Sequence, residues 1–332
     1  MYDMIQKFYD QVIGIRRTIT RQFSREKNQS FTTSLRCWCG HKMAYVFKLE
    51  RSAELSPESK LVAEKELRET PERVKEGLKR TRELLKQNPD LYFGDDDEIF
   101  TIFLRPCKWY PESALALMRR VAEFKRDNAH LLSGLRPEHM KDTVLKCNTA
   151  TILPKRDHKN RRVTIANGGS IWDPSKANVD ELFKWFYLLH IVLLLEPETQ
   201  VNGMVSILDY HNMGWSQVTA VTPSSSRRQL SFLQDASAVR LKEVHVLRQP
   251  MIFNVLWNVL KPFVKEKLKK RLMFHGSKFS SLHKHIPSAH LPAEYGGELP
   301  PTDYSGVPLY EVLQENRAFI EKWDSYGFVS TK

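Results

Sequence analysis

One segment restricts the fold more than any other part of the sequence: an almost wholly apolar helix that runs directly into a dense series of cations. Apolar residues cover most of its circumference, and Asn254, Asn258 and Lys261 form a narrow polar stripe at positions i, i+4 and i+7. Such a helix must be covered on nearly every side. Its apolar positions are Met251, Ile252, Phe253, Val255, Leu256, Trp257, Val259 and Leu260.

Two interpretations of this helix stay open on these residues alone. It is either a central core helix or a lid over an apolar cavity that opens against a membrane. The basic side chains that follow favour the lid, because acyl chains and anionic head groups meet at a membrane surface. These side chains are Lys265, Lys267, Lys269, Lys270 and Arg271.

The positive charge of the chain is concentrated, which indicates an anionic partner. Of the formal net charge of +12, residues 1–42 carry +5 and residues 240–285 carry +9, so the remainder is slightly acidic. Candidate partners are nucleic acid, a phosphorylated ligand and an anionic membrane, and the alternative is a solvated helix face. No nucleic-acid partner is expected, because the basic run lacks interleaved stacking aromatics and a helix-turn-helix pattern.

The length and composition fit one large or two modest globular domains. The chain has 332 residues, of which 41% are hydrophobic. Its longest apolar stretch, Trp185–Leu195, is interrupted by His190 and is shorter than the roughly 20 residues that span a bilayer. Four cysteines are too few for a disulfide framework. We therefore expect a soluble, cytoplasmic protein.

Residues 1–42 differ in composition from the rest and are expected to form a poorly structured basic leader. They end in a cluster of Cys37, Cys39 and His41. A structural zinc site needs four ligands and usually has two residues between paired cysteines, so no metal is predicted. The sequence from Met43 is a plausible translation start, and we expect the folded protein to begin there.

Residues 43–135 are predicted to form an all-helical module. Ser56, Pro57 and Glu58 combine an N-cap residue, a proline at the first helical position and an acid in the first turn, and helical sequence continues to about Lys86. An acidic cluster at 95–98 precedes a second, apolar helix. A third helix opens at 110–112 and continues with core-facing spacing.

The spacing of apolar residues changes after Pro137, which indicates an α/β domain over residues 138–297. Short β-prone runs alternate with helix-length stretches at 179–194 and 223–235. Strands that alternate with helices indicate an α/β sheet. Pro300 and Pro301 begin an acidic C-terminal tail, 298–332. The predicted strands are 149–153, 163–166, 204–208, 239–247 and 271–274.

Enzyme signatures are missing from the sequence. It contains no nucleophile elbow, no phosphate-binding loop and no dinucleotide fingerprint, and a turn explains Gly168 and Gly169. The histidines at 275, 283, 285 and 290 lack an acidic partner at catalytic or metal-ligand spacing, so they are interpreted as capping, packing or surface residues. We expect no catalytic residue and no cofactor.

A series of motifs resembles the CRAL-TRIO lipid-transfer family. The likeness spans about residues 55–297, and the branch it resembles most contains the α-tocopherol transfer protein, the retinaldehyde-binding protein and the clavesins. Upstream, Phe103–Arg105 and Tyr110–Ala114 are similar to the helical module that precedes that domain. The motifs of the domain itself are 239–250, 261–263, 266–272, 275–276, 281–282 and 291–297.

The resemblance implies a mixed β-sheet that forms the floor of an apolar pocket under a mobile lid helix, Met251–Leu260. It also implies phosphoinositide-binding roles for Arg240 and Lys242 before the lid and for Lys267 and Arg271 after it. Strand alternation sends the first two side chains to one face. The other two share a helical face if the helix persists that far.

Two positions depart from the family pattern. Pro106 and Cys107 precede Lys108 where the family often has a further basic contact. Asn212 replaces a family glycine after the strand that ends at Asp209, and asparagine can still adopt a left-handed turn.

The expected function is to bind a hydrophobic lipid and transfer it between membranes, with recognition of phosphatidylinositol bisphosphate by the basic patch beside the lid. The cargo would be tocopherol-, retinoid- or phospholipid-like. Each methylene removed from water contributes about 0.8 kcal/mol, so a lipid leaves a membrane only for an equally apolar cavity. The alternative is a non-catalytic lipid-sensing module that binds a protein.

Overall fold

The computed structural model describes residues 46–52 and 54–329. The chain divides into two compact units, Met1–Ala44 and Tyr45–Lys332, and the described residues belong to the second. The expected leader and the cluster of Cys37, Cys39 and His41 lie outside the described residues, so the interpretations of both stay predictions.

The N-terminal part of the described chain is mainly helical, but the two-residue strand β1 (Leu91–Tyr92) departs from the all-helical prediction. Ser56 caps the first of these helices, and Pro57 occupies its first turn. The helical run expected to reach Lys86 is two helices, because Thr70 and Pro71 provide a second N-cap and a second helix start. The helices are α2 (Pro57–Leu67), α3 (Pro71–Lys86), α4 (Asp97–Leu104), α5 (Pro111–Asp127), α6 (Ala129–Leu132) and the 3-10 helix η2 (Pro137–Met140).

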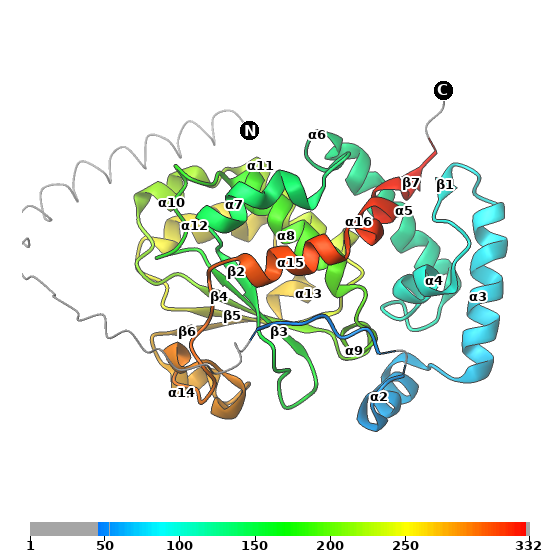
Figure 1. Cartoon of the computed structure of the whole chain (residues 1–332), viewed down its shortest axis with the longest axis horizontal. Helices are drawn as coiled ribbons and strands as arrows, with labels where there is room; N and C mark the ends of the chain where they lie inside the picture. The colour runs from blue at the N-terminus through cyan, green and yellow to red at the C-terminus, as the bar shows by residue number, and fades with distance from the viewer. Residues whose placement is uncertain (1–45, 53, 330–332) are drawn as a thin grey trace, which may run out of the picture. The chain divides into compact units, whose positions relative to one another are not determined.

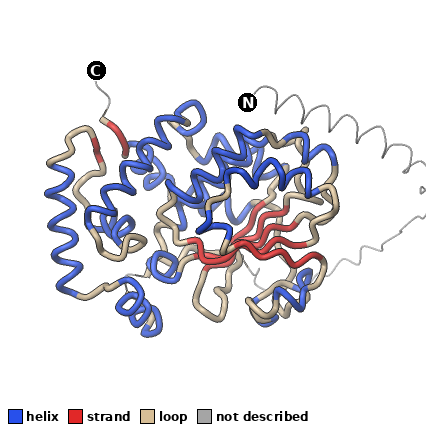
Figure 2. The backbone as a smooth tube through the Cα atoms, turned by 180° about the vertical axis from the view of Figure 1, so that it is seen from behind, coloured by secondary structure: helices blue, strands red, loops and turns tan. Residues whose placement is uncertain are grey.

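A five-stranded mixed sheet follows, in the order β2-β3-β4-β5-β6. Its strands are drawn in red in Figure 2. β2 is antiparallel to β3, and the remaining pairs are parallel. The predicted α/β class with a mixed sheet is therefore confirmed, and every predicted strand is present with slightly different ends. The strands are β2 (Ala150–Ile152), β3 (Arg162–Asn167), β4 (Met204–Asp209), β5 (Leu241–Leu247) and β6 (Leu272–Gly276).

Helices cover one face of the sheet, and a short segment around α14 covers the other (Figure 1). On the α14 face, Val163 and Val205 pack with Leu282 and Ile286. Long helix α8 contributes eight buried side chains to the opposite core. The helices of this domain are α7 (Lys141–Lys146), α8 (Val179–Leu193), α9 (Pro197–Asn202), α10 (Trp215–Ala220), α11 (Pro223–Ser231), η3 (Phe232–Ala236), α12 (Phe253–Leu260), η4 (Lys261–Phe263), α13 (Glu266–Lys269), α14 (Phe279–Leu282), η5 (Ser288–His290) and η6 (Ala293–Tyr295).

Residues 298–329, predicted to be a tail, are folded against the rest of the protein. They contain α15 (Val307–Glu315), α16 (Arg317–Ser325) and β7 (Gly327–Phe328), and β7 pairs with β1 (Leu91–Tyr92) of the N-terminal part. Trp323 is buried, stacks on Phe103 with ring centroids 5.7 Å apart, and donates from Nε1 to the Tyr187 hydroxyl at 3.2 Å. The end of the chain is thus part of the core that holds α8 in place.

The two glycines and the asparagine singled out in the sequence lie in turns. Gly169 follows β3, and a Cβ atom there would lie 2.0 Å from the carbonyl oxygen of His211, so only glycine fits. Asn212, after β4, has φ of 58°. The left-handed turn predicted for this asparagine is confirmed, and both turns lie at the carboxyl ends of neighbouring strands.

Candidate functional site

A cavity of about 300 Å³ lies between the sheet and helices α8, α11 and α12. Thr164, Ser206 and Val244 contribute the sheet side of the wall, and Phe186 and Leu189 of α8 contribute the opposite side. Alternation along β3 and β4 sends Thr164 and Ser206 to this face, while Val163 and Val205 face α14. The predicted apolar pocket with a sheet floor is therefore confirmed.

Helix α12 closes one side of this cavity. Leu256 and Leu260 line it directly. Phe253 is buried and packs on Tyr210 with ring centroids 4.7 Å apart. Asn254 and Asn258 are exposed, as the polar stripe predicts. The helix therefore covers a cavity, in agreement with the lid interpretation, and does not run through the centre of the main core.

The outer side of the lid is apolar and accessible. Met251 is 90% exposed and Phe274 of β6 is 46% exposed. Trp257 is half-buried and packs edge-to-face on Phe274, with ring centroids 5.2 Å apart. The remaining predicted lid residues, Ile252, Val255 and Val259, are half-buried. An apolar cover with an apolar outer surface suits contact with acyl chains.

Three of the four predicted phosphoinositide-binding residues come together at the amino ends of β5 and β6. Arg240 lies just before β5 and donates to the carbonyl oxygen of Val201. Lys242 lies on β5, and Arg271, just before β6, donates to the carbonyl oxygen of Leu241. We call Arg240, Lys242 and Arg271 the basic cluster.

The basic cluster holds more positive charge than its neighbours neutralise. The Oε2 atom of Glu66, on α2, accepts from Lys242 at 3.0 Å and from Arg240 at 3.1 Å. The hydrogen bond from Lys242 is the main cause of a lowered pKa of Glu66. Even so, burial and the nearby Arg240 hold the pKa of Lys242 below its ordinary value, and the same two causes lower the pKa of Arg271. The carboxylate therefore only partly offsets three cations, which leaves the cluster suited to an anion.

Lys267 is placed differently from the prediction. Helix α13 ends at Lys269, so Lys267 and Arg271 do not share a continuous helical face. Lys267 is exposed and lies close enough to Cys107 to stabilise the thiolate of that residue, whose pKa burial nonetheless raises to about 11. Lys267 therefore extends the positive surface towards Cys107.

Sequence reasoning did not identify the polar groups within the cavity wall. His190, a residue of α8 that is 4% exposed, lines the cavity. The Thr164 and Ser206 hydroxyl oxygens lie 3.0 Å apart. For His190, the signal in the sequence was its interruption of an apolar run. For the two hydroxyl groups, the alternation of side chains along the predicted strands could have indicated their position.

His245 and the histidines singled out in the sequence lie on the opposite face of the sheet, around α14. His245 Nδ1 lies 2.9 Å from His275 Nε2, and His275 Nδ1 lies 2.8 Å from the Ser281 hydroxyl. His283 contacts the carbonyl oxygen of Tyr295. Among the described residues, no three His, Cys, Asp or Glu side chains are grouped as metal ligands would be. These histidines pack and form hydrogen bonds away from the lipid cavity.

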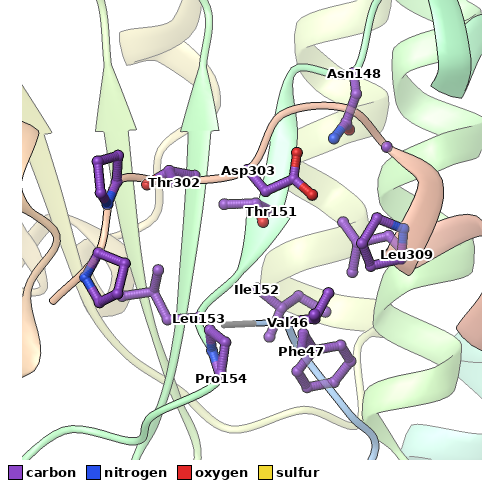
Figure 3. A pocket seen from close by; sticks show the side chains of 14 residues that line it. Val46, Phe47, Asn148, Thr151, Ile152, Leu153, Pro154, Thr302, Asp303 and Leu309 are labelled. Carbon is purple, nitrogen blue, oxygen red and sulfur yellow. The ribbon is translucent and has the colours of Figure 1, made fainter. Parts of the chain in front are cut away.

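A second hollow, of only about 20 Å³, lies where the first described residues and the C-terminal segment cross β2 (Figure 3). Phe47, Thr151, Asp303 and Leu309 are among the residues that line it. Its volume suits about one water molecule. The candidate lipid site is the cavity under α12, because its wall is largely apolar. No helix in the described ranges is long and apolar enough to cross a bilayer.

Comparison with known proteins agrees with this geometry. Residues 147–297 match the CRAL/TRIO domain. Clavesin-1 of Pongo abelii is 31% identical over 254 residues, which cover 76% of this chain and 71% of that protein. Clavesin-2 of Homo sapiens is 32% identical over 253 residues, which cover 76% of this chain and 77% of that protein.

Among solved structures, the crystal structure of Sfh5 is similar with a TM-score of 0.43 and 16% sequence identity, over 80% of this chain and 100% of that chain. The family match covers the sheet, the cavity and the lid, and the clavesins are similar over most of the chain. The chain belongs to the CRAL-TRIO family of lipid-binding proteins, in its clavesin-like branch.

Proposed function

We propose that this protein takes a hydrophobic lipid out of a membrane, shields it under α12 and delivers it to another membrane. The observation that carries the proposal is the cavity itself. Its wall contains no Asp, Glu, Lys or Arg within the described part of the chain. A lipid that gains about 0.8 kcal/mol for each methylene removed from water can leave a bilayer for such a site without a covalent step.

The path of the lipid follows from the position of the lid. α12 separates the cavity from an outer surface that carries Met251 and Phe274. When that outer surface contacts acyl chains, moving the apolar groups of α12 away from the cavity costs less free energy than it would in water. We infer that membrane contact is the condition under which the lid opens.

The basic cluster and Lys267 would direct the protein to phosphoinositide-containing membranes, endosomal or similar, from the cytoplasm. Support comes from the excess of cations around Glu66 and from the lowered pKa values of Lys242 and Arg271, both caused by burial and neighbouring charge. A phosphate group with two negative charges beside these side chains would raise both pKa values again, because it stabilises their charged forms. We further infer that the protein acts as a monomer and without catalytic turnover.

The proposal is tested with donor vesicles that carry a fluorescent hydrophobic lipid and acceptor vesicles that carry a quencher. Transfer should speed up in proportion to the protein added, and more so when acceptors contain bisphosphorylated inositides. Protein-dependent binding of the lipid without any transfer would instead favour a lipid-sensing interaction module. Failure both to bind and to transfer any lipid would overturn the proposal.

A further inference from the structure

The sheet floor of the cavity carries two hydroxyl groups side by side in a largely apolar wall. Thr164 on β3 and Ser206 on β4 are register partners in the sheet, and their hydroxyl oxygens lie 3.0 Å apart. Both side chains line the cavity. We call Thr164 and Ser206 the hydroxyl pair.

Strand geometry directs the hydroxyl pair into the cavity. Side chains alternate along a strand, and the neighbouring Val163 and Val205 pack on the opposite face with Leu282. Those two valines are 0% exposed, whereas Thr164 and Ser206 are only half-buried. Because helices cover this face of the sheet, the surface that the hydroxyl pair leaves open is that of the cavity. A molecule in the cavity can therefore reach it.

The hydroxyl pair has hydrogen-bonding capacity that the protein leaves unused. One of its two protons lies between the two oxygens, so the other needs a second acceptor. The backbone carbonyl oxygen of Val205 is 3.4 Å from Thr164 Oγ1, which is long for a hydrogen bond from a hydroxyl group. Ser206 Oγ has no further partner among the described residues. The pair can therefore donate one hydrogen bond to a molecule in the cavity and accept another.

The rest of the wall restricts the partner of the hydroxyl pair to uncharged groups. No Asp, Glu, Lys or Arg of the described residues lines the cavity. A carboxylate or phosphate beside the hydroxyl pair would be buried without a cationic partner, which is strongly unfavourable. A hydroxyl or carbonyl oxygen can accept a hydrogen bond from the pair without burying a charge.

We propose that the hydroxyl pair binds an uncharged oxygen of the cargo, so that the cargo is a neutral lipid with a hydroxyl or carbonyl group. The inference rests on the proposed function, because it concerns the lipid that the cavity holds. It narrows the tocopherol-, retinoid- or phospholipid-like range to lipids without a charged head group. A hydroxyl group, which donates and accepts, uses the pair more fully than a carbonyl group, which only accepts.

The test measures what the hydroxyl pair contributes to the binding of four lipids that share a sixteen-carbon chain: hexadecanol, 2-hexadecanone, hexadecane and palmitate. Each competes with the neutral fluorescent probe N-phenyl-1-naphthylamine for the full chain. The double variant Thr164→Val with Ser206→Ala removes both hydroxyl groups. It should bind hexadecanol and 2-hexadecanone about ten-fold more weakly than the wild type does, and hexadecane at least as tightly. Palmitate should bind the wild type more weakly than hexadecanol does.

A matched control removes a hydroxyl group that already has a partner. Ser226 also lines the cavity, but its hydroxyl group donates to the carbonyl oxygen of Thr222 at 2.8 Å. Ser226→Ala should bind all four lipids as the wild type does. Urea unfolding verifies that the variants are folded. If the double variant is unstable, Thr164→Val alone repeats the test, because valine has nearly the same shape and suits a strand.

Mass spectrometry of lipids extracted from the purified full chain gives an independent measurement. Neutral alcohols, ketones, aldehydes or esters as the main lipid of the wild type, and less of them in the double variant, support the inference. An affinity for hexadecanol that is unchanged in the double variant, or that falls no more than the affinity for hexadecane, overturns it. A phospholipid or fatty acid as the main extracted lipid also overturns it, while leaving lipid transfer intact. Absence of any bound or transferred lipid overturns the proposed function as well.

Discussion

Lys242 and Glu66 form an ion pair between β5 and α2, with 3.0 Å between Nζ and Oε2. The same carboxylate oxygen also accepts from Arg240. An anionic head group that binds the basic cluster therefore competes with a carboxylate that belongs to the protein. The strength of membrane docking should depend on this competitor as well as on the cations.

Neutralising the competitor should strengthen docking. We expect Glu66→Gln to increase the affinity for vesicles containing phosphatidylinositol bisphosphate by about 1 kcal/mol, because one opposing charge is removed at the surface. Sedimentation with vesicles measures the change. Glu64→Gln is the matched control, since Glu64 is exposed on the same helix, and it should change binding little. Equal binding of wild type and Glu66→Gln would remove Glu66 from the docking site.

Removing cations should have the opposite effect. The double variant Lys242→Ala and Lys267→Ala should lose at most about 2 kcal/mol of binding to the same vesicles, and the loss should shrink with added salt. These lysines are preferred to Arg240 and Arg271, which donate to backbone carbonyls. Lys75→Ala with Lys79→Ala, two exposed lysines of α3, is the control of equal charge. Equal losses in both double variants would indicate non-specific attraction.

A charge on the lid should separate lid function from folding. Trp257 is only half-buried, so Trp257→Asp should leave far-ultraviolet circular dichroism nearly unchanged while vesicle association and lipid retention fall. Asn258→Asp places the same charge at the next, exposed position of α12 and should have a smaller effect. Global unfolding of Trp257→Asp would show that α12 is a core helix.

Acid should destabilise the protein through buried histidines. Burial lowers the pKa of both His190 and His245 to about 4. For His245, the nearby His275 also lowers the pKa, whereas Glu243 acts to raise it. Between the unfolded value near 6.5 and the folded value, the unfolded state binds more protons, so the free energy of unfolding falls as pH falls.

Urea denaturation at pH 7.5 and pH 5 measures this fall. His245→Gln should reduce the difference between the two pH values, because one buried titration is removed. His130→Gln, at an exposed position of α6, is the control and should leave the difference unchanged. A pH-independent free energy of unfolding in the wild type would contradict the assignment of neutral buried histidines.

Much of the fold could be predicted because it depends on local sequence. The caps at Ser56 and the acidic start of α4 mark helix ends, and β-branched runs mark the strands of the sheet. Asn212 was correctly expected in a left-handed turn, since asparagine tolerates that conformation.

The parts that sequence reasoning missed depend on tertiary contacts. Glu66 meets Arg240 across 174 residues of chain, and no local pattern indicates that pairing. Lys267 and Arg271 are expected to share a helical face only if the helix persists that far, and this condition is not met because α13 ends at Lys269, before the chain enters β6. His190 looked like an interruption in an apolar helix, and only the packing of α8 over the sheet places it at a cavity.

The C-terminal residues illustrate the same limit. Their acidic composition and paired prolines suggested a tail, but Trp323 is buried by contacts with Phe103 and Tyr187. A buried tryptophan in a short amphipathic helix needs a partner surface that the local sequence does not reveal.

The most direct test of the central claim is transfer of a fluorescent hydrophobic lipid from neutral donor vesicles to acceptors that contain phosphatidylinositol bisphosphate. Each wild-type molecule should carry many lipid molecules in succession, whereas Trp257→Asp and the Lys242, Lys267 double variant should transfer the lipid several-fold more slowly. Transfer by the wild type no faster than spontaneous exchange, with the protein folded and the lipid in excess, would contradict the account.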